Sequence, residues 1–355
     1  MIFSDFIELH RGYDLPKAKR NADGLVPVIA AGGYDGFHDA AKVQGPGVIT
    51  GRSGTLGSVY FNTTDFWPLN TTLFVSNFKG NDPLFVYYYL KTMDLGRYAT
   101  GTTVPTLNRN HLDQIKVNIP DLAQQREIAN KLNLFDEKIS MLNDINDNLL
   151  ELADATFKKN YEQQVGNQKL ETLATVKGGK RLPKGAPLTE VKTQHPYLRI
   201  TDYSKNGVPS VQSMQYITEE VFDKISRYVI NEGEVFLSIV GTIGIVDLID
   251  ERLDNASLTE NAVKIHAQTT AMAHYLYLYL RSDEGRHEID SRTVGTTQKK
   301  LAITRIKDFD VGVISETDLQ EFERTVSPLI NMVLANRSEI DTLVQIRDSL
   351  LQELI

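Results

Sequence analysis

The chain has 355 residues, a net charge of −8, 41% hydrophobic and 8% aromatic residues, a composition typical of a soluble globular protein with two or three domains. It contains no cysteine, which excludes a disulfide framework and any metal site built on thiolates. The sequence does not open on a basic stretch followed by a long apolar one, and no apolar run has membrane-spanning length. We therefore expect a cytoplasmic protein with no membrane partner.

The acidic residues are unevenly distributed along the chain. The net charge is +1 over residues 1–120, −4 over residues 121–165, 0 over residues 166–313 and −5 over residues 314–355. The excess of acid lies in two segments rich in helix formers. The two segments that precede them are nearly neutral, so each can present a local basic face.

Residues 1–120 predict a first domain of mixed α/β structure. Short runs of Val, Ile, Tyr, Phe and Thr, broken by Gly, Asn and Pro, predict short strands with irregular sheets. A helix is expected to begin at Asp82-Pro83, since Pro is well tolerated in a first helical turn. Consecutive tyrosines Tyr87–Tyr89 point in different directions on that helix, so core packing is favoured over base stacking for them.

Residues 121–165 predict one long helix, from Ala123 to about Tyr161, uninterrupted by Pro or Gly. Its apolar residues recur with the alternating spacing of a heptad seam, which is typical of a coiled coil. A helix of roughly 40 residues would be about 60 Å long, and such a length favours a coiled coil over a core helix of an ordinary domain, which is the alternative. The seam residues are Ile128, Leu132, Phe135, Ile139, Leu142 and Leu149, with Asn146 as the polar member.

Residues 166–313 repeat the plan of the first domain. Residues 178–184 resemble residues 11–17, and Glu232–Ile249 resembles the glycine-turn-strand passage Gly45–Phe61. Gly178 lies 167 residues after its counterpart Arg11, whereas Phe322 lies 194 residues after its counterpart Ile128. This growing offset between the copies means that the second domain is longer by insertion. Insertions fall in loops, and internal repetition decides the architecture here: one domain and one long helix, present twice. The helix that contains Tyr87–Tyr89 has a counterpart in the second domain, and the tyrosines of that counterpart are Tyr275, Tyr277 and Tyr279.

Residues 314–355 predict the second long helix, from Thr317 to Ile355, and the simplest partner for each long helix is the other one, in antiparallel orientation. Asn336 matches Asn146, so the two could pair and fix the register; the alternative is two solvated polar residues. Pro328 lies inside this helix and is expected to kink or break it. The seam residues are Phe322, Val326, Leu329, Val333, Ile340, Leu343 and Leu350.

Several passages carry a resemblance that covers essentially the whole chain. ITGRSGTLGSVYF, DFWPLNTTLFV and the stretch from DPLFVYYYLK to QQREIANKL resemble a target-recognition domain and the long helix of type I restriction-modification specificity subunits; GTTQKKLAITRIKDFDVGVI and RDSLLQELI resemble the second copy. This resemblance implies two α/β recognition domains separated by an antiparallel two-helix coiled coil. It also implies a non-catalytic subunit that binds a bipartite, asymmetric double-stranded DNA target.

The resemblance further implies partner subunits. Two methyltransferase subunits, acting on adenine with S-adenosylmethionine, would bind around the helices, and endonuclease/translocase subunits would use ATP and Mg²⁺. No cofactor is expected in this chain. The alternative is a coiled-coil adaptor whose two domains bind proteins, for which no salt-dependent DNA affinity is expected.

Basic residues near glycine turns are the candidate DNA contacts. Arginine can bind a guanine edge with two hydrogen bonds, and cationic side chains, threonine hydroxyls and backbone amides can bind phosphates; the Gly-Thr-Thr stretches at 101–103 and 295–297 fit the latter role. The alternative is that the basic loops are only solvated and the glycines only permit tight turns. The residues are Arg11, Lys17, Lys19, Arg20, Arg52 and Arg109 in the first domain and Lys177, Lys180, Arg181, Lys184, Arg292, Lys299 and Lys300 in the second.

Motifs of common enzymes are missing from the sequence. There is no Gly-Lys-Ser/Thr phosphate loop, no Gly-x-Ser-x-Gly elbow, no His-Glu-x-x-His helix, no deaminase zinc signature and no Asn-Pro-Pro-aromatic tetrapeptide. Paired carboxylates have no role that the sequence alone assigns, since 46 acidic residues always supply pairs.

Arg52 has no counterpart in the second domain, where Ile239 and Val240 precede Gly241. The shared fold therefore does not require Arg52, which is either a base contact particular to one half-site or a surface arginine; the insertions in the second domain favour different targets for the two domains.

Overall fold

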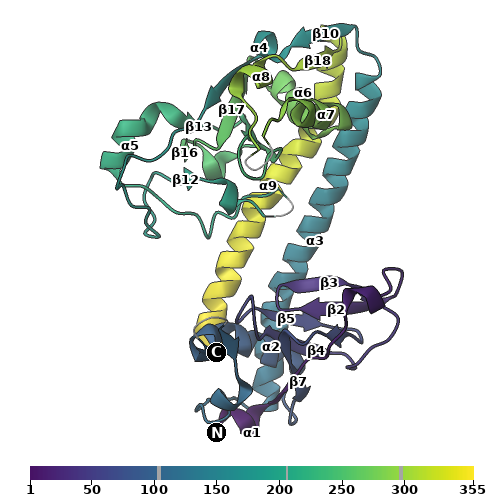
Figure 1. Ribbon diagram of the computed structural model, residues 1–355, viewed down its shortest axis with the longest axis vertical. Helices are drawn as coiled ribbons and strands as arrows, with labels where there is room; N and C mark the ends of the chain where they lie inside the picture. Colours follow the sequence, from purple (N-terminus) through teal and green to yellow (C-terminus); the bar gives the residue numbers. More distant parts are fainter. Residues whose placement is uncertain (102–104, 205–206, 296–298) are drawn as a thin grey trace. The chain divides into compact units, whose positions relative to one another are not determined.

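The computed structural model describes residues 1–101, 105–204, 207–295 and 299–355. The chain forms two compact units: unit 1 contains Met1–Lys138 and Leu343–Ile355, and unit 2 contains Ile139–Thr342. Helices α3 (Leu122–Tyr161) and α9 (Glu316–Leu354) are each continuous and contribute to both units (Figure 1). The two expected long helices are therefore present, each beginning one residue earlier than the periodicity predicted.

Unit 1 is built on an antiparallel sheet with the strand order β1-β7-β4-β5. Helix α2 (Pro83–Thr92) packs on β4 and β5, and it begins where the sequence predicted, because the Asp82 carboxylate accepts hydrogen bonds from the amides of Leu84 and Phe85. A second sheet has the order β3-β2-β6, in which β2 and β6 are parallel. The strands are β1 (Glu8–Arg11), β2 (Val26–Ala30), β3 (Gly33–His38), β4 (Gly47–Gly51), β5 (Val59–Asn62), β6 (Trp67–Pro68) and β7 (Thr72–Asn77).

The remaining elements of unit 1 are short. Strands β8 and β9 pair as an antiparallel ladder after the main sheet. These elements are α1 (Phe3–Phe6), η1 (Lys17–Lys19), η2 (Leu95–Tyr98), β8 (Ala99–Thr100), β9 (Thr106–Leu107) and η3 (Arg109–His111).

Unit 2 repeats the main sheet of unit 1 and the parallel strand pair of its second sheet. Its main sheet has the order β11-β17-β14-β15 and is antiparallel, and its second sheet has the order β12-β16-β13, with β12 and β16 parallel. Helix α6 (Thr270–Arg281) packs on β14, β15 and β17 as α2 does in unit 1. The strands are β11 (Ala174–Gly178), β12 (Tyr197–Leu198), β13 (Val229–Ile230), β14 (Val235–Ser238), β15 (Val246–Leu248), β16 (Ala256–Leu258) and β17 (Ala262–Ala267).

Several elements of unit 2 lie outside those two sheets. Strands β10 and β18 form a separate antiparallel pair. These elements are β10 (Gly166–Lys169), α4 (Leu170–Leu173), η4 (Ile200–Asp202), α5 (Glu219–Ile225), η5 (Ser226–Tyr228), η6 (Glu251–Leu253), α7 (Asp283–Arg292), α8 (Ile303–Lys307) and β18 (Asp310–Val313).

The internal repeat extends to individual backbone contacts. The Tyr13 amide donates to the Pro68 carbonyl at 2.8 Å, and the Lys180 amide donates to the Leu258 carbonyl at 2.8 Å. A Cβ atom at Gly12 would lie 2.1 Å from the Leu69 carbonyl oxygen, and one at Gly179 would lie 2.1 Å from the Thr259 carbonyl oxygen. Both copies thus require glycine at the same close approach of two backbones, which confirms the offset of 167 in this region.

The ends of the long helices are also core helices of the two units. In unit 2 the Phe157 ring lies 5.0 Å from Tyr275 and 6.5 Å from Phe322. In unit 1 Leu132 of α3 and Leu351 of α9 belong to one apolar core. The coiled-coil and core-helix alternatives therefore both describe these helices. Tyr88, Tyr275 and Tyr279 are fully buried and Tyr277 is 2% exposed, so the prediction that most of these tyrosines pack in the core is confirmed.

The predicted seam is buried, and the long helices run antiparallel. Asn336 Nδ2 donates to Asn146 Oδ1 at 2.8 Å in unit 2, which confirms the expected asparagine pair. Helix α9 continues through Pro328, so the break that was one expectation for this residue is absent. All the named seam residues are buried or half-buried: Ile128, Leu132, Phe135, Ile139, Leu142, Leu149, Phe322, Val326, Leu329, Val333, Ile340, Leu343 and Leu350.

Candidate nucleic-acid interface

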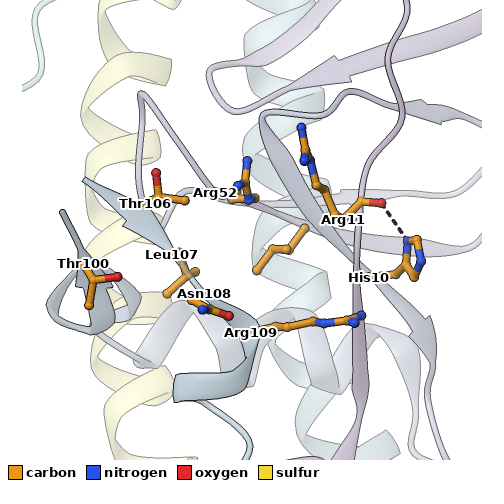
Figure 2. A pocket seen from close by; sticks show the side chains of 9 residues that line it. His10, Arg11, Arg52, Thr100, Thr106, Leu107, Asn108 and Arg109 are labelled. Carbon is orange, nitrogen blue, oxygen red and sulfur yellow. Dashed lines mark hydrogen bonds between the residues drawn. The ribbon is translucent and has the colours of Figure 1, made fainter. Parts of the chain in front are cut away.

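Unit 1 contains a cavity of about 330 Å³ that collects three of the predicted contact residues. Arg11 ends β1, Arg52 follows β4, and Arg109 begins η3, so three segments far apart in sequence meet at one site. Figure 2 shows the side chains of Arg11 and Arg52 extending next to each other. Around them the other described lining residues are uncharged or histidine: His10, Leu73, Thr100, Thr106, Leu107 and Asn108.

The charge of this cavity is unbalanced. Burial lowers the pKa of the Arg52 guanidinium, and the positive charge of Arg11 lowers it further. Arg52 Nη1 donates to the Asn70 carbonyl at 3.3 Å, which holds the side chain in place without neutralising it. Within the described part of the chain, neither Arg11 nor Arg52 forms an ion pair. The cavity is therefore electropositive.

Arg109 and Arg20 have structural contacts of their own. Arg109 Nη1 donates to the Leu9 carbonyl at 2.9 Å, which joins η3 to β1 but leaves its remaining donors available. Arg20 pairs with the Asp35 carboxylate at 2.8 Å and also donates to the Asp35 carbonyl at 2.7 Å. The guanidinium of Arg20 is thus largely used in closing its loop, whereas Lys17 and Lys19, in the same basic cluster, are exposed on η1. DNA contact by these residues stays a prediction.

In unit 2, two of the predicted arginines form ion pairs. Arg292 bonds to Glu288 at 2.8 Å, to Asp308 at 2.7 Å and to Asp310 at 3.4 Å, so it holds α7 against the start of β18. Arg181 bonds to Glu260 at 2.7 Å. A phosphate would have to displace carboxylates to reach either guanidinium, which makes Arg292 the weaker candidate because it has three such partners.

The lysines of unit 2 are more accessible. All five predicted lysines are exposed, and Lys180 Nζ lies 5.5 Å from the centre of the Tyr228 ring. Lys300 forms backbone bridges with Val240 and Val294, which fixes its backbone and leaves its side chain in solvent. The lysines are Lys177, Lys180, Lys184, Lys299 and Lys300.

Sequence reasoning missed an aromatic hollow of about 550 Å³ in unit 1. The His10 ring stacks on Tyr13 at 5.9 Å and contacts Phe74 at 5.5 Å. Lys42 Nζ lies 5.1 Å from the Trp67 ring and 5.9 Å from the Tyr13 ring. Aromatic faces beside a cation are suited to nucleobases. His10 precedes Arg11 in sequence, but nothing in the sequence places Lys42 or Phe74 beside it.

Residues 102–103 and 296–297 of the two Gly-Thr-Thr stretches lie outside the described residues. Phosphate binding by these stretches therefore stays a prediction. In the described part of the chain, no three His, Asp or Glu side chains are grouped closely enough to bind a metal ion. No helix in that part is long and apolar enough to span a bilayer.

Two copies of one α/β fold, each with a different set of cations and each packed on segments of both long antiparallel helices, define a two-domain protein of the internally repeated class. The chain belongs to the family described as type I restriction modification DNA specificity domain, whose model matches residues 3–151 and 163–314. It is a specificity subunit of a type I restriction-modification system, and DNA recognition is the role of this family.

Known relatives agree with this assignment. The chain is 25% identical over 307 residues to the type I restriction enzyme MjaIX specificity subunit of Methanocaldococcus jannaschii. The matched region covers 76% of this chain and 68% of that relative. It is 20% identical over 310 residues to the MjaVIII specificity subunit of the same organism, covering 74% and 72%. The fold matches a crystal structure of the type I restriction-modification S subunit from M. genitalium, with a TM-score of 0.62, 18% identity and coverage of 100% and 95%.

Proposed function

We propose that this chain binds a bipartite, asymmetric double-stranded DNA target, one half with each unit, and performs no catalysis itself. Two adenine-N6 methyltransferase subunits would assemble with it and bind S-adenosylmethionine. Endonuclease/translocase subunits, with ATP and Mg²⁺, would complete the complex. The family assignment supports the DNA role; the composition of the complex and the location of its cofactors belong to the proposal.

The observation that carries this proposal is the placement of cations on the repeated fold. Lys180 occupies in unit 2 the backbone position of Tyr13 in unit 1, as their equivalent hydrogen bonds show. Lys300 pairs with Val240 as Thr106 pairs with Ser53. Equivalent backbone positions thus carry different side chains, so the two units present different donors to DNA and require different half-sites.

The proposal is tested by co-expressing the chain with its methyltransferase partner and mapping modified adenines in the host DNA. A motif of two short specified halves around an unspecified gap is the expected result. A stable complex whose methylation does not depend on this chain would contradict targeting and would favour the protein adaptor. A second experiment measures the DNA affinity of the complex at several salt concentrations. The affinity should fall steeply as salt rises, because binding to phosphates releases counterions from the DNA.

A further inference from the structure

The cavity of unit 1 places the guanidiniums of Arg11 and Arg52 together, and its described lining residues include no carboxylate. Arg11 and Arg52 extend next to each other (Figure 2), and the described residues that line the cavity with them include Thr100 and Asn108, which carry neutral donors. Two other arginines of the same unit are paired with carboxylates: Arg20 with Asp35 at 2.8 Å and Arg347 with Asp136 at 2.5 Å. Two unbalanced guanidiniums repel each other, and an anion bound between them would remove that repulsion.

Unit 2 lacks this arrangement at the equivalent place. The Arg52 amide donates to the Thr71 carbonyl at 2.8 Å, and the Ile239 amide donates to the Asn261 carbonyl at 2.8 Å. The carbonyls of Arg52 and Ile239 also accept equivalent bonds, from the amides of Leu107 and Leu301. Ile239 therefore stands at the position of Arg52.

The position of Arg11 is also apolar in unit 2. Arg11 faces Leu73 across its ladder, and Gly178 faces Val263 across the matching ladder. A Cβ atom at Gly178 would lie 2.9 Å from Ile303 Cδ1, so Ile303 occupies space that a side chain would need. The shared fold forms without the arginine pair, which indicates that folding does not require the pair and that it is available to a ligand of unit 1.

We propose that Arg11 and Arg52 together bind one phosphate oxyanion, supplied by a phosphodiester of the DNA half-site that unit 1 reads, and that unit 2 has no equivalent contact. The assignment rests on the proposed function for the source of the phosphate. Guanidinium donors suit phosphate oxygens, and the Thr100 hydroxyl in the cavity lining adds a neutral donor. A tetrahedral anion can bridge two side chains from different segments, whereas a flat base edge is bound by one arginine by itself.

The test uses the full chain in complex with its methyltransferase partner, and a duplex that carries the mapped motif. The variants R11G and R52I introduce the residues that unit 2 has at these positions, R52K keeps the charge, and R324A removes an exposed arginine of α9 as a control. Affinity is measured by fluorescence anisotropy across a range of KCl concentrations. The double variant R11G/R52I is expected to lower the slope of log K against log salt by about 0.9, the value for one phosphate.

R52K should retain most of the slope, and R324A should retain all of it. The loss in R11G/R52I should be equal for the target duplex and for duplexes with altered bases, because a phosphate carries no sequence information. An unchanged slope in a complex that still binds DNA would overturn the phosphate contact and leave the proposed function intact. A loss confined to duplexes with guanine at one position would show base reading and would also overturn it.

A second arm does not depend on DNA. Phenylglyoxal modifies accessible arginines, and inorganic pyrophosphate should protect Arg11 and Arg52, but not Arg324, as measured by mass spectrometry of the full chain. Protection together with the altered slope supports the proposal. Protection without any salt-dependent DNA binding would show a site for a free phosphate and would overturn the phosphodiester; lack of protection would overturn the anion site itself.

Discussion

At the scale of single residues, unit 2 contains a buried network of charges. Arg337 of α9 has a side chain that is 5% exposed, and its Nη1 lies 2.9 Å from Asp247 and 3.9 Å from Asp250. Arg252 bonds Asp250 at 2.6 Å and also bonds Asp341 of α9. Burial raises the pKa of Asp247, and the charge of Arg337 opposes that shift. The network joins the end of the main sheet to the long helix.

Removal of Arg337 should destabilise unit 2 strongly. Arg337→Ala leaves Asp247 buried without its partner, and we expect a loss of about 3–5 kcal/mol in the free energy of unfolding. Arg324→Ala, on the same helix but in an exposed pair with Glu321, should change it by less than about 0.5 kcal/mol. Urea unfolding followed by circular dichroism measures both. Recovery in R337A/D247N would confirm the cause, and a loss below about 1 kcal/mol in R337A would contradict it.

Alkaline pH should weaken unit 1 through Tyr87. Burial, and then the charge of Asp136, raise the pKa of this phenol from 10.0 to about 12. Because the folded state favours the neutral form, its contribution is complete below pH 10 and is lost as pH rises from 10 through about 12. In urea unfolding at pH 9, 10 and 11, the wild-type chain should lose more stability than Tyr87→Phe. Parallel pH profiles would refute this role.

At the scale of elements, the two long helices combine an apolar seam with one buried amide pair. Asn146 is 7% exposed and accepts from Asn336 at 2.8 Å. Any shift in the register of the helices would separate these two side chains and leave a buried amide without its partner. The pair therefore favours one antiparallel alignment at some expense in stability relative to an apolar seam.

A double-mutant cycle should expose this effect. Asn336→Leu leaves the buried Asn146 amide without this partner and should cost about 1–3 kcal/mol, whereas N146L/N336L should be as stable as the wild type or more so. The free energy of unfolding in urea provides the measurement. Additive losses in the double variant would show that the two residues act independently, against the pairing described here.

At the scale of the whole molecule, two units with one fold and different donors predict independent recognition. Exchange of residues 166–313 for the matching segment of the MjaIX specificity subunit should change one half of the methylated motif and leave the other half unaltered. Exchange of residues 1–120 is the reciprocal control and should change the other half. The motif is read by mapping methylated adenines. A change of both halves in either exchange would argue against one half-site per unit.

Local patterns in the sequence determined much of this protein. The heptad spacing predicted both long helices, because a periodic apolar stripe of that length requires a partner helix. The repeated glycine turns predicted two copies of one fold, and Asp82-Pro83 predicted the start of α2. Arginines near glycines identified three of the segments that meet at the cavity of unit 1.

Only the tertiary structure decided which charges are paired. Arg20 and Asp35 lie 15 residues apart, Arg292 and Asp308 lie 16 apart, and Arg337 and Asp247 lie 90 apart, so no local pattern distinguishes them from Arg11 and Arg52. Pairing depends on which strands and loops meet in space, and periodicity carries no information about that. The sequence by itself therefore determined the elements and their repetition, whereas the packing of the sheets decided which cations remain available to a ligand.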